Sequence, residues 1–82
     1  MKLIRNKLTD DAIFKILPYM KGVFTLNISQ NMLTERVLDI IIEGRAYLES
    51  MRSIIISQNK IMERKAKPKL DKLKSMDLTI SI

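Results

Sequence analysis

The chain has 82 residues, a length that allows one domain with a modest hydrophobic core. It contains no Cys and no His, which excludes a disulfide framework, a thiolate metal site and the commonest general base. The formal charge is +6, and the segment 60–74, with seven basic and two acidic residues, carries most of it. No apolar run is long enough to cross a bilayer or to serve as a signal peptide, so we expect an intracellular, cytoplasmic protein without a transmembrane segment.

The first predicted helix follows Thr9, whose hydroxyl can cap the helix N-terminus. Asp10 and Asp11 would lie in the first turn, where the helix dipole favours negative charge. Pro18 cannot continue a helical hydrogen-bond ladder and biases the residue before it away from helical dihedrals, so the helix is expected to end near Leu17.

A second, longer helix is predicted to begin at Thr34, which is its expected cap. Its buried stripe is predicted to consist of Val37, Leu38, Ile41 and Leu48. Gly44 falls within this helix, where it costs about 1 kcal/mol relative to Ala. A glycine at this position would allow a neighbouring helix to pack closely.

The third connection, residues 62–72, is rich in charge and poor in apolar residues. Pro68 lies in its middle. Because proline removes a helical hydrogen bond, we expect a short helix before Pro68 or an irregular loop here. A complete packed helix is not expected.

Two stretches of the chain share one pattern, which is apolar, any, apolar, Ser, Gln, Asn, any, apolar. They are residues 26–33, LNISQNML, and residues 54–61, IIISQNKI, and weaker copies lie at 1–8 and 76–81. The last polar positions of the four copies, separated by 25, 28 and 22 residues, are Asn6, Asn31, Asn59 and Ser81. A recurrence at roughly 20–29 residues is typical of a repeat protein.

Each copy is predicted to begin with a short strand, in which alternate side chains point to opposite faces. Because helices separate the strands, the strands are expected to pair in parallel and to bury one continuous apolar column. The residues predicted to point into that column are Met1, Leu3, Leu26, Ile28, Ile54, Ile56, Met76 and Leu78.

The asparagines Asn6, Asn31 and Asn59 are predicted to form a structural ladder. After each strand the chain must turn beneath the apolar column, which leaves backbone groups buried. A carboxamide side chain has both donors and an acceptor, so it can satisfy its own turn and the adjacent one.

The stretches 26–33 and 54–61 resemble the conserved segment of leucine-rich repeats, and the helical units resemble the ribonuclease-inhibitor-like subclass. The resemblance covers nearly the whole chain, as units of about 1–25, 26–53 and 54–75 and a partial unit 76–82. It implies an α/β solenoid with short parallel strands on the concave face and helices on the convex face, used as a protein-binding scaffold. Spacing is irregular, Ile and Met replace many leucines, and Ser81 stands where Asn is expected.

Solenoids need terminal caps with polar outer faces, and neither end of the sequence provides one. We therefore expect the chain to be a segment of a longer repeat array or to be completed by a partner.

The resemblance also implies that the concave strand face carries the contacts with a partner. That candidate binding face consists of Thr25, Asn27, Ser29, Ser53, Ile55, Ser57, Ser75, Asp77 and Thr79. It is rich in hydroxyl groups and nearly free of charge, which suits hydrogen-bonded contact with a protein. If no partner uses it, the same face is the solvated side of a sheet.

The expected function is a non-enzymatic protein–protein interaction or scaffolding module. The alternative is a small basic nucleic-acid-binding protein or ribonucleoprotein component that acts through Lys60–Lys74, a segment which could otherwise be a solvated loop. We predict no catalytic residue, no cofactor and no metal site. The serines have no His partner, and the two glycines are isolated, so no glycine-rich phosphate loop is present.

Overall fold

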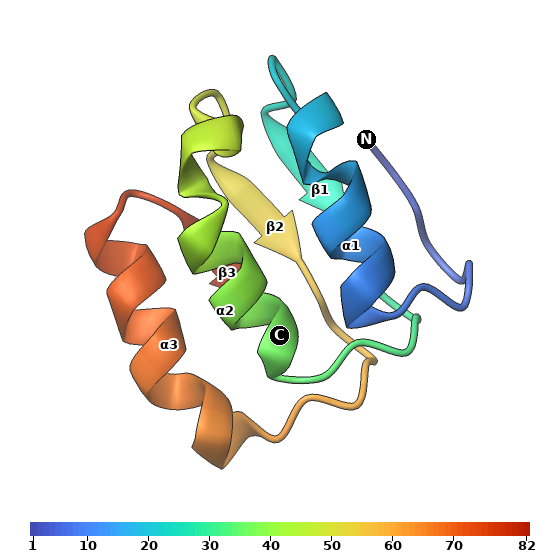
Figure 1. The fold of residues 1–82 in the computed structure, drawn as a ribbon. Helices are drawn as coiled ribbons and strands as arrows, with labels where there is room; N and C mark the ends of the chain where they lie inside the picture. Colours follow the sequence, from blue (N-terminus) through green and yellow to red (C-terminus); the bar gives the residue numbers. More distant parts are fainter.

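Helices and strands alternate along the chain in a computed structural model that describes all of residues 1–82. The elements in order are α1 (Asp10–Ile16), η1 (Leu17–Tyr19), β1 (Thr25–Asn27), α2 (Arg36–Glu43), η2 (Arg45–Leu48), β2 (Ser53–Ile55), α3 (Glu63–Ser75) and β3 (Thr79–Ser81). The helices form one layer and the strands lie behind them (Figure 1). The protein is therefore a small α/β domain.

The three strands form one parallel sheet in the order β1-β2-β3. Thr25, Ser53 and Thr79 share one row across the sheet, and the next row places the buried Leu26 beside Ile54. The N-terminal segment extends this sheet through a bridge between Lys2 and Asn27. The prediction of parallel strands joined by helices is confirmed.

The last strand begins later than the sequence pattern predicts. The predicted alignment pairs Met76 with Ile54, whereas the structure pairs Ile80 with Ile54 and Ser81 with Ile55. The reason is that α3 extends to Ser75 and is followed by a tight turn, so the chain reaches the sheet four residues later. Ser81 therefore lies in a strand and is not the equivalent of the ladder asparagines.

The first helix follows the prediction. The Thr9 hydroxyl accepts a hydrogen bond of 3.4 Å from the Ala12 N–H, and the α-helix ends at Ile16 before the 3-10 turn that contains Pro18. The buried carboxylate of Asp10 reaches the next unit, where it accepts a 3.0 Å bond from the backbone N–H of Thr34. The start of α1 is thereby joined to the segment that precedes α2.

The second helix is shorter than predicted because it ends at Gly44, after which the chain continues as η2. Its N-cap is Glu35, although the Thr34 hydroxyl accepts a 3.3 Å bond from the Arg36 N–H. Gly44 packs closely against the preceding unit, since a Cβ at this position would lie 2.5 Å from Leu17 Cδ1. The expected close approach at Gly44 is therefore present.

The prediction of a short helix or loop around Pro68 is wrong, because α3 runs through Pro68 for 13 residues. Two sets of contacts stabilise the helix on both sides of Pro68. Ala66 and Leu73 are fully buried against the core. On the side facing α2, the Lys69 ammonium forms a 2.7 Å ion pair with Asp39. Packing and pairing with α2 together offset the hydrogen bond that proline removes.

The hydrophobic core lies between the helices and the sheet. Its buried members are Ile13, Leu17, Met20, Leu26, Ile28, Leu33, Val37, Leu38, Ile40, Ile41, Leu48, Met51, Ile54, Ile56, Ala66, Leu73 and Leu78. Most of the predicted column is therefore buried, but Met1 is 53% exposed because it lies at the open edge of the sheet. Leu3 and Met76 are partly buried and pack against the core.

No aromatic residue belongs to this core. The exposed fractions are 63% for Phe14, 82% for Tyr19, 67% for Phe24 and 53% for Tyr47. Aliphatic residues and methionine alone fill the interior, and the aromatic surface remains available to solvent.

Candidate functional site

The side chain of Asn59 joins two successive turns. Its carboxamide oxygen accepts bonds from the backbone N–H groups of Asn31 (3.1 Å) and Leu33 (3.0 Å). Its Nδ2 donates to the carbonyl oxygens of Ile28 (3.1 Å) and Ile56 (2.9 Å). One side chain thus satisfies backbone groups in its own turn and in the turn one unit earlier.

Asn31 makes the same set of bonds one unit earlier in the chain. Its oxygen accepts from the N–H groups of Asn6 (2.8 Å) and Leu8 (3.0 Å), and its Nδ2 donates to the carbonyls of Leu3 and Ile28, both at 2.9 Å. Asn31 is buried, so these bonds replace water. The prediction that the Asn6 side chain belongs to the ladder is wrong, because Asn6 is exposed and contributes only its backbone N–H.

The glutamine of each turn has a left-handed backbone conformation, with φ of 56° at both Gln30 and Gln58. Arg5 takes the corresponding position in the first turn, with φ of 59°. Its Nε donates a 2.9 Å bond to Gln30 Oε1. The three turns therefore share a left-handed residue before the asparagine, and the first turn differs in having a second one, Lys7, with φ of 55°.

The sheet face, defined as the side of the sheet opposite the helices, presents Thr25, Asn27, Ser53, Ile55, Thr79 and Ser81. Thr25 and Thr79 are exposed, and Ser53 is half-buried between them in the same row. None of the six side chains is charged. Neighbouring strands lie about 4.8 Å apart, so the hydroxyl groups of the row form a regular series.

Not all residues predicted for the concave face lie there. Ser29 is 6% exposed, and its hydroxyl donates a 2.7 Å bond to Asn27 Oδ1. The backbone of the N-terminal segment covers it, since Arg5 N–H donates to Ser29 O at 3.2 Å. Ser57 is half-buried in the turn that follows β2.

The strand positions predicted for Ser75 and Asp77 are wrong. Ser75 is the last residue of α3, and its hydroxyl donates to Lys72 O within that helix. Asp77 lies in the turn before β3, with φ of 62°. The late start of β3 therefore removes both residues from the sheet and leaves Thr79 as the first residue of the strand.

The basic segment Lys60–Lys74 forms most of α3 and the approach to it. Two of its cations are paired with acidic groups next to or within α2, because Lys65 lies 4.0 Å from Glu35 and Lys69 lies 2.7 Å from Asp39. The cations that form no salt bridge are Lys60, Arg64, Lys67, Lys72 and Lys74. Their side chains are exposed, so α3 presents a positively charged outer surface.

Glu35 is the one titratable group with a clearly shifted pKa. Its own backbone N–H holds the pKa of the carboxyl below its ordinary value of 4.5, and the backbone N–H of Met62 and the ammonium of Lys65 act in the same direction. Partial burial opposes them. The carboxylate thus connects the start of α2 with the start of α3.

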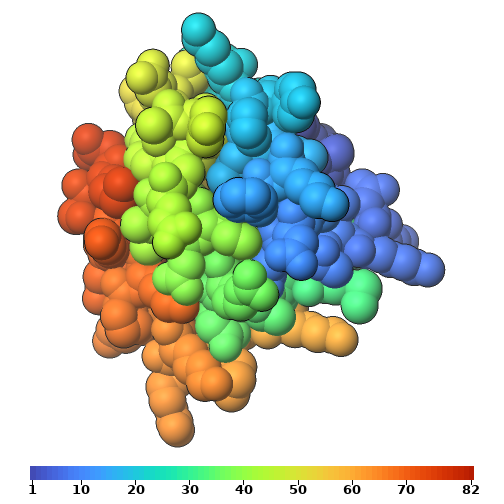
Figure 2. Space-filling model, viewed as in Figure 1, coloured from blue at the N-terminus to red at the C-terminus, as the bar shows by residue number.

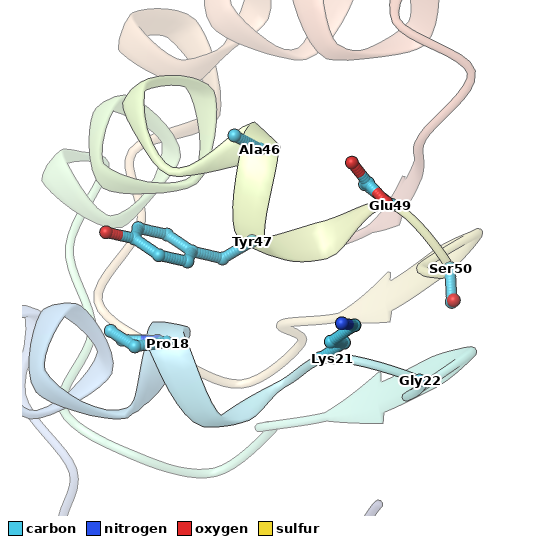
Figure 3. A pocket seen from close by; sticks show the side chains of 7 residues that line it. All are labelled: Pro18, Lys21, Gly22, Ala46, Tyr47, Glu49 and Ser50. Atoms are coloured by element: carbon cyan, nitrogen blue, oxygen red, sulfur yellow. The ribbon is translucent and has the colours of Figure 1, made fainter.

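A groove that the sequence reasoning missed lies between α1–η1 and α2–η2. It consists of two adjoining hollows of about 280 Å³ and 250 Å³, and Pro18 and Tyr47 line both. In Figure 3 the ring of Tyr47 lies above Pro18, and Lys21 and Glu49 belong to opposite sides. The exposed positions of Pro18 and Tyr47 could not be recognised without knowing which units face each other.

No cluster of His, Cys, Asp and Glu side chains is arranged to hold a metal ion. None of the helices has the length and the apolar character needed to cross a membrane. When the chain is compared with protein-family profiles, with characterised proteins and with solved structures, no match is found. The interpretation of its function therefore depends on the chain's own geometry.

Proposed function

We propose that the chain is a leucine-rich-repeat segment of the ribonuclease-inhibitor-like kind, a non-enzymatic module that binds a protein partner through its sheet face. The observation that carries this proposal is the ladder of Asn31 and Asn59. It holds successive turns at a fixed separation, so the strands before them present their outer residues in aligned rows.

The chemistry of the sheet face supports a protein partner. Its hydroxyl and amide groups can both donate and accept hydrogen bonds, and Ile55 supplies an apolar centre between Asn27 and Ser81. Small side chains allow a partner to approach the strands closely. The side chains of the three strands on this face carry no charge and so have little attraction for phosphate groups, whereas protein interfaces combine hydrogen bonds with an apolar centre.

A photo-crosslinking experiment tests this proposal. Benzoylphenylalanine is introduced at Ile55, or as a control at Lys67 on the outer surface of α3, and each protein is irradiated in an extract of the source cells. We expect an adduct from the Ile55 position that excess unmodified chain suppresses. A Thr25→Arg/Thr79→Arg competitor should fail to suppress it. Equal adducts from both positions, or suppression by both competitors, would contradict the proposal.

A second candidate function is nucleic-acid binding by α3, favoured by its four cations without acidic partners and by Lys60 just before it. The helix carries no aromatic residue that could stack on bases, so any such binding would be to phosphates. If four phosphates are neutralised, affinity for a short RNA or DNA duplex should fall by roughly a hundredfold between about 50 and 200 mM salt. Fluorescence anisotropy measures this. Binding that is absent at the lower salt concentration would eliminate this candidate.

A further inference from the structure

The first hollow of the groove between α1–η1 and α2–η2 has apolar walls, and charged side chains border both hollows. Leu17, Ile40 and Gly44 line the first hollow together with Phe14 and Tyr47. Phe14 is 63% exposed and Tyr47 is 53% exposed. We name this groove the helix seam. In the space-filling view the residues of α1 and α2 lie side by side on the face turned to the viewer (Figure 2).

The charges on the two sides of the helix seam have opposite signs. Lys15 and Lys21 belong to the α1 side, and Glu43 and Glu49 belong to the α2 side. The first hollow is bordered by Lys15 and Glu43, and the second is bordered by Lys21 and Glu49. All four side chains are exposed, and none of them forms a salt bridge. The ion pair that joins α1 to α2, between Asp11 and Arg36 at 3.8 Å, involves residues that do not line either hollow.

This arrangement is self-complementary under one particular two-fold rotation. A second copy turned by 180° about an axis that runs along the seam places its lysine side over the glutamate side of the first copy. Lys15 then lies opposite Glu43 of the other copy, and Lys21 lies opposite Glu49. Rotation about an axis across the seam would instead place like charges together. An isologous contact therefore has one favourable geometry.

We propose that the helix seam is a homodimer interface, in which a second copy of this chain covers Phe14, Pro18 and Tyr47. Charge complementarity identifies the partner as a second copy, because the lysine side of one copy faces the glutamate side of the other. Covering Phe14 and Tyr47 removes exposed apolar surface from water, which provides the attraction, while the four charge pairs fix the orientation. The sheet face lies on the opposite side and stays free, so this inference is independent of the proposed function.

Sedimentation equilibrium on the intact chain tests the proposal. For a small surface of this kind we expect a reversible dimer with a Kd of roughly 10–100 µM. The variants Lys15→Glu/Lys21→Glu and Glu43→Lys/Glu49→Lys should each be monomeric, with dimerisation weakened by at least about a hundredfold, because each makes both sides alike in charge. An equimolar mixture of the two variants should form a heterodimer at least as tight as the natural dimer.

Matched controls separate this result from a general charge effect or a folding defect. Arg64→Glu/Lys67→Glu reverses two cations on α3 and should leave the dimer unchanged. Phe14→Ala should weaken dimerisation by about tenfold or more, whereas Phe24→Ala, at an equally exposed aromatic outside the seam, should not. Circular dichroism verifies that each variant is folded. A natural chain that stays monomeric to about 500 µM, a reversed variant that still dimerises or a mixture that fails to associate would overturn the proposal.

Discussion

The carboxamide oxygen of Asn59 accepts a 3.1 Å hydrogen bond from the backbone N–H of Asn31, 28 residues earlier in the chain. Asn31 in turn uses its own side chain to bind the backbone N–H groups of the preceding turn. Asn31 therefore donates its backbone N–H to the side chain of the next turn and accepts N–H groups from the preceding turn. The stability of one turn depends on the asparagine side chain of the next turn.

Replacing the ladder asparagines should destabilise the protein more than replacing a sheet-face asparagine. Asn31→Ala leaves buried backbone donors and carbonyls without partners, and we expect a loss of about 3 kcal/mol in the free energy of unfolding. Asn59→Ala should have a similar effect. Asn27→Ala removes the acceptor of the Ser29 N–H and of the Ser29 hydroxyl, which is fewer bonds than either ladder asparagine makes, and should cost about 1 kcal/mol. Urea denaturation of the three variants measures the difference, and equal losses would contradict the structural distinction.

Gly44 should tolerate no side chain while Leu17 is present. A Cβ at Gly44 would lie 2.5 Å from Leu17 Cδ1, so Gly44→Ala forces the buried Leu17 side chain to move and should cost about 2 kcal/mol. In a Leu17→Ala background the contact with Cδ1 is gone and the 3.1 Å approach to Ile40 O remains, so the same substitution should cost less. A double-mutant cycle measured by thermal unfolding determines the coupling. Additive effects would show that the clash is not the cause.

Pro68 is expected to weaken the helix that contains it. Substituting Ala adds a helical N–H donor, and the added backbone entropy of the unfolded chain offsets part of the gain. We therefore expect Pro68→Ala to raise the free energy of unfolding by about 1–2 kcal/mol. The matched substitution Lys67→Ala, next to it on the exposed surface, should change stability little. A destabilising Pro68→Ala would contradict a regular helix across this position.

The lowered pKa of Glu35 predicts a pH dependence of stability. A carboxyl whose pKa is lower in the folded state contributes stability that is fully present above its unfolded value, near 4.5, and is lost as the pH falls through the folded value. The natural chain should therefore lose more stability than Glu35→Gln between about pH 7 and pH 3. Urea midpoints at both pH values measure the effect. Parallel losses in the two proteins would refute this role for Glu35.

The repeat pattern predicted most of the strands and turns. It combines apolar residues at alternate strand positions with an asparagine that binds the backbone of the following turn. Leu26, Ile28, Ile54 and Ile56 are buried as expected, since strand alternation determines their side. The pattern misaligns the last copy because Met76 and Leu78 satisfy its apolar positions, although Met76 caps α3 and Leu78 precedes β3. Local pattern could not reveal that α3 extends to Ser75.

Long-range partners account for the remaining differences. Pro68 indicates a helix end when the sequence is read locally, but the pairing of Lys69 with Asp39 and the burial of Ala66 depend on α2, which lies far away in sequence. The helix seam likewise forms only where two units pack against each other, so neither unit shows it alone. Phe14 and Tyr47 are 33 residues apart and share a hollow only after the units stack.

Amide hydrogen exchange tests most directly the central claim that in-phase asparagines hold successive units together. In the natural chain, the N–H groups of Asn31 and Leu33, which donate to Asn59, should exchange slowly. Asn59→Ala should accelerate exchange at these two positions by about tenfold or more while leaving Asn6 and Leu8, which donate to Asn31, largely protected. Unchanged protection at Asn31 and Leu33 in the Asn59→Ala protein would contradict the ladder.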